Sequence, residues 1–326
     1  MKPKLLQLIH CPTCHSKDFE FITINENQQE IREGFVICRN CQNMYEINNG
    51  ILNLLISPTP EIISEQQGWT QLEKAVQNTD ELMLSLPDAV GENQSYWQSQ
   101  AENFHYMWDQ LALDGNEVVL DLGSGRCWST RFFARAGCYA VGIDILQTKY
   151  VGLLTSDIYI NNEGVFFERL CGNMNELPFR SESFDVIFIA ATLHHSSSIV
   201  TTLKQVEMLL KPGGYIVLIN EPVARIMSNK KISCPEIDHG INEHVYWFAE
   251  YLYSFRKVGL KVKLYPFIGS YHPIISGINH SLVKRFPQKL MKRRIWPPLL
   301  PLQLILAGGI LNLIAHKPSF SEKNLQ

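Results

Sequence analysis

The N-terminal part of the chain carries four cysteines in two close pairs. Cys11 and Cys14 occur in HCPTCH, and Cys38 and Cys41 occur in CRNC, with 23 residues between the pairs. Two C-x2-C pairs can supply four thiolates to one tetrahedral zinc ion, and a shell closed by four protein ligands is structural rather than catalytic. Because a segment this short buries little apolar surface, a metal would stabilise it. The spacing predicts structural Zn²⁺, with two unrelated thiol pairs as the alternative.

A second candidate site begins at a glycine-rich turn in VVLDLGSGRCWST. An apolar run is followed there by an acid and a small-residue turn: Asp121, Gly123, Ser124 and Gly125. Asp144 follows in VGIDI, 23 positions after Asp121. An acidic residue at about this distance from a glycine turn is placed to accept hydrogen bonds from ribose hydroxyls. The pattern predicts a site for a nucleoside-containing ligand.

The third small position of this turn is unusual. It holds Cys127, followed by the large Trp128, where a dinucleotide-binding turn commonly has glycine. A pyrophosphate over a helix N-terminus needs a narrow loop, so the missing glycine disfavours a dinucleotide. We expect Cys127 to be tolerated if its φ is negative.

Histidines and carboxylates near predicted strand ends could act on a substrate. His194 and His195 occur in AATLHHSSS, His244 occurs in DHGINEHVYWF, and Glu221 ends an apolar run. A base within hydrogen-bond reach of a hydroxyl contributes roughly 10²–10⁴-fold to its reaction. We predict catalytic groups among these four; the alternative is that one histidine packs and the other caps the helix that follows.

The same stretch also has a spacing that suits a metal pair. His239 and Glu243 are four positions apart, which places two ligands on one face of a helix. The sequence offers no evident third ligand, so we do not expect a catalytic metal.

Alternating strands and helices must position these residues. The apolar runs predict strands over 117–122, 138–143, 165–171, 184–190 and 214–220, with helices over 128–137, 147–156 and 198–210. This alternation is typical of a doubly wound α/β sheet, in which ligands bind at the carboxyl ends of the strands. The polar candidates follow strand ends, so the pattern predicts that they meet at one edge.

Four stretches in consecutive order resemble the class I S-adenosylmethionine-dependent methyltransferases: DLGSGRCWSTRFFARAGCYAVGIDI, NMNELPFRSESFDVIF, AATLHHSSS and LLKPGGYIVLINEP. The resemblance spans about residues 110–222. It implies a Rossmann-like, doubly wound seven-stranded sheet and S-adenosyl-L-methionine as cofactor. It also implies cofactor contacts from Asp121, Gly123, Ser124, Gly125, Asp144, Ile145, Asn173, Met174 and Ala190. The family commonly has Asp at the position of Asn173, whose amide oxygen can still accept from an adenine amino group.

The resemblance extends to the organisation of the chain. MYEINNGILNLL, after Cys41, is similar to the end of a short zinc ribbon that precedes many bacterial methyltransferase domains. We therefore expect a zinc ribbon over 1–57, a linker and N-terminal helices over 58–110, and a methyltransferase domain over 111–326. SPTPEIISEQQG, residues 57–68, is interpreted as a polar linker. Residues 222–305 are expected to form a substrate-covering insert.

Charge and composition bear on the acceptor. The net charge is −3, and residues 1–57 are not notably basic, which disfavours nucleic acid as the partner. The aromatic-rich insert favours a small molecule, or a glycan- or lipid-linked metabolite. The alternatives are an RNA methyltransferase whose ribbon contacts RNA, and a cofactor-binding protein without catalysis.

An uncharged stretch near the C-terminus allows two interpretations. Residues 295–315 are long enough to span a bilayer, but three prolines and two glycines interrupt them. One interpretation is a loop and a buried terminal strand, LILAGGILNLIAHK. The other is peripheral membrane contact through 283–315, because six basic side chains in VKRFPQKLMKRR precede the stretch. The start MKPKLLQLIHC lacks a cleavage pattern, so we predict a cytoplasmic protein, peripheral at the membrane under the second interpretation.

Overall fold

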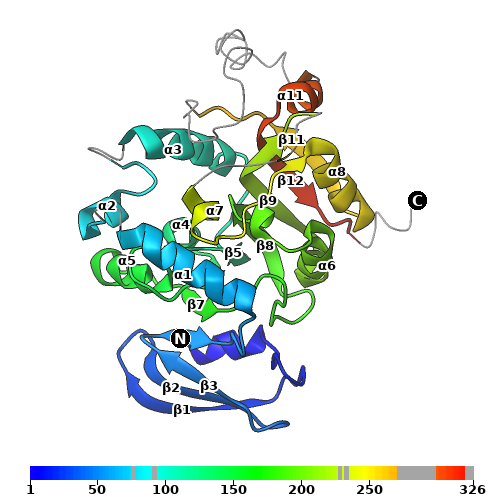
Figure 1. The fold of residues 1–326 in the computed structure, drawn as a ribbon. Coiled ribbons are helices and arrows are strands. Elements are labelled where there is room, and N and C mark those ends of the chain that lie inside the picture. The colour runs from blue at the N-terminus through cyan, green and yellow to red at the C-terminus, as the bar shows by residue number, and fades with distance from the viewer. Residues whose placement is uncertain (75–77, 90–93, 227–229, 231–234, 270–298, 320–326) are drawn as a thin grey trace.

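The computed structural model describes residues 1–326 except 75–77, 90–93, 227–229, 231–234, 270–298 and 320–326. The described residues form one twelve-stranded sheet with helices packed against it (Figure 1). Its strands are β1 (Phe19–Glu26), β2 (Ile31–Cys38), β3 (Met44–Asn48), β4 (Ile51–Asn53), β5 (Val118–Leu122), β6 (Tyr139–Asp144), β7 (Glu168–Cys171), β8 (Phe184–Ala190), β9 (Leu210–Ala224), β10 (Tyr246–Trp247), β11 (Lys261–Tyr265) and β12 (Gly309–His316).

Seven of these strands form the predicted α/β sheet. Their order is β7-β6-β5-β8-β9-β12-β11, so the chain starts in the middle, moves to one side and then returns to the other. The first five are parallel to one another, whereas β12 is antiparallel to both β9 and β11. This is the doubly wound topology expected from the sequence, and the predicted fold class is confirmed.

Two apolar cores cover the two faces of the sheet, because side chains alternate along each strand. In β5, Leu120 and Leu122 belong to one core and Val119 belongs to the other. The packing helices are α1 (Pro60–Lys74), α2 (Asp80–Ser85), α3 (Gln94–Trp108), α4 (Trp128–Arg135), α5 (Ser156–Glu163), α6 (Ile199–Leu209), α7 (Pro235–Asp238), α8 (Phe248–Lys257) and α11 (Leu300–Ala307). Short 3-10 turns are η1 (Pro3–Gln7), η3 (Leu153–Thr155) and η4 (Leu193–His195).

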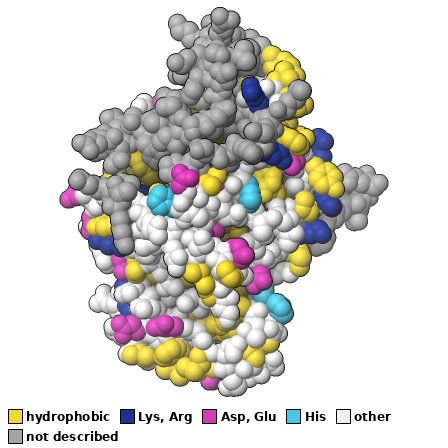
Figure 2. Space-filling model, viewed as in Figure 1, with side chains coloured by type: hydrophobic (Ala, Val, Ile, Leu, Met, Phe, Trp, Pro, Cys, Tyr) yellow, Lys and Arg dark blue, Asp and Glu magenta, His cyan; other side chains and the backbone are white. Residues whose placement is uncertain are grey.

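The cysteine-rich segment continues the main sheet. Strand β4 pairs in parallel with β7, with Leu52 opposite Leu170. Leu5 and Val36 of the cysteine-rich segment belong to the same apolar core as Leu120 of the central strand β5. Residues 1–54 therefore share both a sheet and a core with the methyltransferase-like part. Figure 2 shows hydrophobic side chains on this segment at the bottom of the view, where β1–β3 lie.

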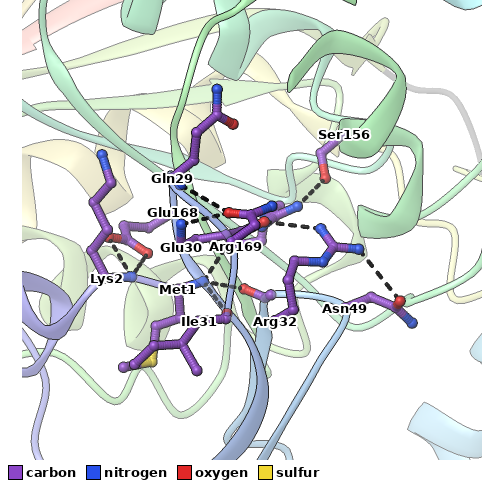
Figure 3. Close-up of polar contacts among 12 residues, drawn as sticks. Met1, Lys2, Gln29, Glu30, Ile31, Arg32, Asn49, Ser156, Glu168 and Arg169 are labelled. Atoms are coloured by element: carbon purple, nitrogen blue, oxygen red, sulfur yellow. Dashed lines mark hydrogen bonds and ion pairs between the residues drawn. The ribbon is translucent and has the colours of Figure 1, made fainter. Parts of the chain in front are cut away.

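A buried charge network joins the segment to the sheet (Figure 3). The Glu30 carboxylate pairs with the Arg169 guanidinium, and both side chains are fully buried. Arg169 also contacts Asp157 at 2.9 Å, and Arg32 binds the two oxygens of Asp157 at 2.8 Å each. Burial alone would raise the pKa of Glu30, but Arg169 and the amine of Met1 hold it at about 2. The network fixes charged groups from β2, β7 and α5 to one another.

Several predicted boundaries differ from the structure. The predicted linker 57–68 is helical from Pro60, because Thr59 caps the helix and proline suits its first turn. The helix expected over 147–156 is instead η3 followed by α5, which ends at Glu163. The strand expected over 165–171 starts at Glu168, and the strand expected over 214–220 covers Leu210–Ala224.

The C-terminal part mixes expected and unexpected elements. The predicted strand LILAGGILNLIAHK begins with the end of α11, and β12 starts only at Gly309, after left-handed backbone at Gly308 (φ +70°). The expected insert 222–305 contains α8 and β11, which belong to the core layers. The basic stretch 283–294 lies outside the described residues. Among the residues that the structure describes, no helix has the length and apolar character needed to cross a membrane.

Candidate functional site

A cavity of about 830 Å³ lies at the carboxyl ends of the parallel strands, as the topology requires. Residues after β5, β6, β7 and β8 form one side, and helix α1 forms another. Eight of the nine predicted cofactor residues line it: Gly123, Ser124, Gly125, Asp144, Ile145, Asn173, Met174 and Ala190. The strand order thus brings together residues that are far apart in sequence.

The glycine turn and Asp144 are built as one unit. The Gly125 N–H donates to Asp144 Oδ2 at 2.8 Å, and the Leu146 N–H donates to Asp144 Oδ1 at 2.9 Å. Gly123 has φ +70°, and a Cβ there would lie 2.0 Å from Thr192 Cγ2. Only glycine fits this position, because both the backbone angle and the space exclude a side chain. Burial raises the pKa of Asp144 to about 6.

Asp121 is the predicted cofactor residue that does not line the cavity. Its Oδ2 accepts from the hydroxyls of Ser129 at 2.7 Å and Thr130 at 2.6 Å. These bonds tie the start of α4 to the end of β5. Asp121 therefore stabilises the glycine turn through these bonds and does not face the cavity. Burial raises the pKa of Asp121 to about 6.

Asn173 lines the cavity, and its expected contact with adenine stays a prediction. Its Oδ1 accepts from the backbone N–H of Asn175 at 2.9 Å and from the Asn175 Nδ2 at 3.2 Å. One further expectation for the cofactor side is corrected. Cys127 has φ +58°, so it adopts the left-handed conformation usual for glycine instead of the negative φ expected. Its backbone N–H donates to Ser124 O at 2.7 Å, which closes the turn.

Of the four predicted catalytic residues, three lie together and only His195 lines the cavity. His194 Nδ1 lies 2.9 Å from Glu221 Oε2, and His195 lines the cavity. Glu221 is fully buried and does not line the cavity; its carboxylate accepts the backbone N–H groups of Thr192 and Leu193 at 2.8 Å each. It is a positioning residue, because it holds the His194 ring and the turn after β8. His244 is half-buried with its ring 5.8 Å from Tyr246, and it is not a lining residue.

Glu243 joins the two histidines. Its Oε2 lies 3.2 Å from His194 Nε2, and its Oε1 lies 3.6 Å from His195 Nε2. Glu243 therefore faces His194 and His195, whereas the sequence spacing suggested His239 as its partner. Burial alone would lower the pKa of His194, but Glu221 and Glu243 raise it to about 10. Burial and the neighbouring His194 lower the pKa of His195 to about 4.

Helix α1 supplies site residues that were not predicted. Glu65 and Trp69 line the cavity, and burial, with Asp144 and Glu243 nearby, raises the pKa of Glu65 to about 7. Ile62 and Leu72 line it as well, so the four positions follow the three- and four-residue spacing of one helix face. That spacing was present in the sequence, but the prolines near its start favoured a linker.

The four N-terminal cysteines converge as predicted from their spacing. Their Sγ atoms lie within 4.8 Å of one another, with Cys11 3.6 Å from Cys41 and Cys14 3.5 Å from Cys38. Four Zn–S bonds of about 2.3 Å in a tetrahedron place sulfurs about 3.8 Å apart, so this set fits one zinc ion. Tyr45 Oη contacts Cys11 Sγ at 2.8 Å, and the cavity has no lining residue from 1–54.

The structure thus has a doubly wound sheet with a cavity at the carboxyl ends of its parallel strands. Residues 120–218 match the family model described as a methyltransferase domain. The chain is 33% identical over 110 residues to demethylmenaquinone methyltransferase of Tropheryma whipplei, covering 33% of this chain and 43% of the relative. It is 24% identical over 200 residues to glycine/sarcosine/dimethylglycine N-methyltransferase of Actinopolyspora halophila, covering 51% and 35%.

A solved structure described as the [4+2]-cyclase SpnF has the same fold. It superposes with a TM-score of 0.52 at 18% identity, covering 81% of this chain and 98% of the neighbour. The similarity to methyltransferases is carried by residues 120–218, the segment that the family model matches. The chain spans less than half the length of the two curated relatives named above. Because the structural neighbour is described as a cyclase, the shared fold does not by itself define a reaction.

Proposed function

We propose that this chain transfers a methyl group from S-adenosylmethionine to a small-molecule acceptor, free or linked to a glycan or lipid. One observation carries the proposal: besides its cofactor candidates, the cavity is lined by further polar side chains, Glu65, His195 and Glu236, which we call the acceptor wall. Its volume of about 830 Å³ lies toward the upper end of the roughly 300–1,000 Å³ of small-molecule sites. There is room for an acceptor beside a cofactor.

The lining residues predicted to contact the cofactor, which we call the cofactor wall, include Gly123, Gly125 and Asp144. Their chemistry suits S-adenosylmethionine. Asp144 would accept from a ribose hydroxyl, since a carboxylate offers about four lone pairs and the backbone N–H groups of Gly125, Ile145 and Leu146 use three. Gly123 and Gly125 allow the backbone to approach the methionine end. When bound, the cofactor supplies a methyl group already activated on a sulfonium. The chain's own contribution is alignment of the two reactants.

The acceptor wall would orient the nucleophile. His195 is neutral at pH 7, because its pKa is lowered to about 4. Its Nδ1 lies 2.8 Å from Asn242 O, so that nitrogen carries the proton and Nε2 carries the lone pair. His194 packs against the His195 ring and is itself held by Glu221, so these two residues would act as positioning residues for His195. His244 lies apart from the cavity, so we give it no role in orienting the acceptor.

The relatives support a small acceptor. The names of the two relatives above refer to demethylmenaquinone and to glycine, sarcosine and dimethylglycine. A third relative, from Gibberella zeae, is named a sterol 24-C-methyltransferase and is 27% identical over 129 residues. These names favour a metabolite over RNA as the acceptor here. Peripheral membrane contact through 283–315 stays a prediction.

We further propose that Cys11, Cys14, Cys38 and Cys41 hold one structural Zn²⁺. The four sulfurs fit a tetrahedral shell, and four thiolates leave no position open for a substrate. His10 and His15 are not members of this set.

The test is a labelling experiment with the purified chain. It is incubated with methyl-labelled S-adenosylmethionine and fractionated cell extract, and the label is followed into RNA, lipid, glycan and small metabolites. We expect label in a metabolite, glycan or lipid fraction, and none with Gly123→Arg, whose side chain would occupy the turn beside Thr192. Label confined to RNA would overturn the proposed acceptor class. Cofactor binding without label in any fraction would overturn the proposed activity.

A further inference from the structure

The cluster of His194, His195 and Glu243 contains an electrostatic conflict that protons alone do not resolve. Each Glu243 oxygen faces a different imidazole: Oε2 lies 3.2 Å from His194 Nε2, and Oε1 lies 3.6 Å from His195 Nε2. The two rings are 4.2 Å apart, and all three side chains are nearly buried. Water therefore does little to screen the groups that converge here.

The proton positions follow from the partners of the other ring nitrogens. His194 Nδ1 faces the Glu221 carboxylate at 2.9 Å, and His195 Nδ1 faces the carbonyl oxygen of Asn242 at 2.8 Å. Both partners only accept, so both Nδ1 atoms donate. If each ring carried only this one proton, both would present the lone pair of Nε2 to a Glu243 oxygen. No donor would then lie between the two lone pairs and the carboxylate.

A single added proton resolves only half of this conflict. A proton on His194 Nε2 would let that ring bridge Glu221 and Glu243. The His195 Nε2 lone pair would still face Glu243 Oε1, because the proton of that ring is on Nδ1. A divalent cation at the meeting point resolves both contacts at once, since it binds both lone pairs and the carboxylate.

The dimensions and surroundings fit a metal. Metal–nitrogen and metal–oxygen bonds of about 2.0–2.2 Å, at angles of about 90–110°, place neighbouring ligand atoms about 2.8–3.6 Å apart, a range that includes the two distances above. Metal-bound histidines typically donate their second N–H to a carboxylate or a backbone carbonyl. Glu221 and Asn242 O provide these two partners. Glu221 is itself fixed by the N–H groups of Thr192 and Leu193 and by the Tyr251 hydroxyl at 3.2 Å.

We infer that His194 Nε2, His195 Nε2 and the Glu243 carboxylate bind a divalent transition-metal ion. Two imidazoles and one carboxylate suit ions such as Mn²⁺, Fe²⁺, Co²⁺ or Zn²⁺. Three ligands leave coordination positions open, and His195 lies in the cavity wall. The open side accepts an oxygen of the methyl acceptor, such as a hydroxyl or a carboxylate. This last step rests on the proposed function, whereas metal binding itself does not.

The test uses Mn²⁺ as probe, because the cysteine thiolates favour softer ions. The full chain is dialysed against a chelator and titrated with Mn²⁺, and bound ion is followed by electron paramagnetic resonance. We expect one Mn²⁺ per chain and hyperfine coupling to imidazole nitrogen. The Cys38→Ser variant is expected to bind Mn²⁺ equally, which separates this site from the cysteine cluster.

Three variants locate the ion. Glu243→Gln is expected to weaken Mn²⁺ binding by more than about 100-fold, because it removes a ligand, and Glu221→Gln by about 10–100-fold, because it alters a ligand's partner. His239→Gln, in the same segment but outside the cluster, is expected to leave the affinity unchanged. His195→Gln provides a second ligand variant, and the melting temperature of each variant shows that it is folded.

The outcomes separate this inference from the proposed function. A wild-type chain that does not bind Mn²⁺ but transfers methyl label overturns the metal site alone. Mn²⁺ binding without label in any fraction supports the metal site and overturns methyl transfer. Mn²⁺ affinity that is equal in the wild type and in folded Glu243→Gln or His195→Gln would place the ion elsewhere and overturn the inference.

Discussion

Among the residues that the structure describes, potential metal ligands converge at two sites, and these sites differ in what surrounds them. The cysteine cluster offers four sulfurs, and no residue of 1–54 lines the cavity. The cluster of His194, His195 and Glu243 offers three ligands, of which His195 lines the cavity. A complete shell can only stabilise the chain around it, whereas an incomplete shell facing a cavity can bind a substrate atom. Ligand number and access, rather than ligand chemistry alone, separate a structural role from a chemical one.

The largest predicted effect tests the structural side of this comparison. Cys38→Ser removes one of four thiolates, and structural zinc contributes about 10–16 kcal/mol in isolated zinc-finger peptides. We expect zinc content to fall from one equivalent to none, with rapid hydrogen exchange over residues 1–54. Protection of β5–β9 persists, because these strands have a core on each face. Cofactor affinity changes by less than about threefold, or about 0.7 kcal/mol.

The matched control is Cys138→Ser, a buried cysteine outside the cluster. It is expected to keep its zinc. Loss of cofactor binding in Cys38→Ser with β5–β9 still protected would show that the two sites are coupled, and the comparison would fail.

The second prediction concerns the buried charge network that connects residues 1–54 to strand β7. Glu30→Gln removes the carboxylate that pairs with Arg169 and the Met1 amine, leaving buried positive charge less compensated. We expect a loss of about 3–5 kcal/mol in the free energy of unfolding, measured by urea denaturation at pH 7. Glu33→Gln, at an exposed position of β2 three residues after Glu30, should change it by less than about 0.5 kcal/mol.

The pH dependence of this effect has a defined sign. The folded-state pKa of Glu30 is lowered to about 2, below its usual value, so its stabilisation is fully present above the unfolded pKa. It is lost as the pH falls from about 4.5 towards 2. The difference between wild type and Glu30→Gln should shrink over that range; a difference that stays constant would mean that ionisation of Glu30 is not its cause.

The sequence predicted the sheet and the cofactor wall well, because both depend on local signals. Strand ends followed by a glycine turn or an acid placed Gly123, Gly125 and Asp144 in one cavity once the doubly wound topology was assumed. The cysteine spacing was similarly local. These features need no knowledge of distant side-chain packing.

The acceptor wall was predicted less well, because it depends on contacts between distant segments. Glu65 was assigned to a linker, although Thr59-Pro60 is a helix start signal and the cavity-lining positions of α1 follow a helical period. Glu243 meets His194 and His195 across about fifty residues, and the local spacing pointed to His239 instead. Cys127 adopts a left-handed backbone that its residue type does not favour. In each case tertiary contacts override the local preference.

The third prediction tests the glycine turn of the cavity by adding one methyl group at Gly123. Gly123→Ala places a Cβ at positive φ, 2.0 Å from Thr192 Cγ2, so either the turn or Thr192 must move. Gly164→Ala has a similar φ of +66° with nothing within 4 Å, and thus shares the backbone strain of roughly 1–2 kcal/mol without the clash. We expect cofactor affinity, measured by calorimetry, to fall at least about tenfold, or 1.4 kcal/mol, in Gly123→Ala alone. Equal losses in both variants would exclude the contact with Thr192 as the cause.

The smallest predicted effect is the pH dependence of cofactor affinity. Asp144 has a raised pKa of about 6 in the free protein, and ribose hydroxyls donate to its ionised form. Below pH 6 a proton competes with the ribose, so the affinity should fall by up to about tenfold per pH unit, or about 1.4 kcal/mol. Asp144→Asn should bind more weakly at pH 7.5 and show a flatter profile between pH 5 and 6. Glu65 has a raised pKa of about 7 and lies nearby, so Glu65→Gln is measured in parallel. This variant should still lose cofactor affinity below pH 6.

The opposite result would contradict the assignment of Asp144 to the ribose. If the loss of affinity below pH 6 disappears in Glu65→Gln and persists in Asp144→Asn, then Glu65 rather than the ribose contact of Asp144 controls cofactor affinity.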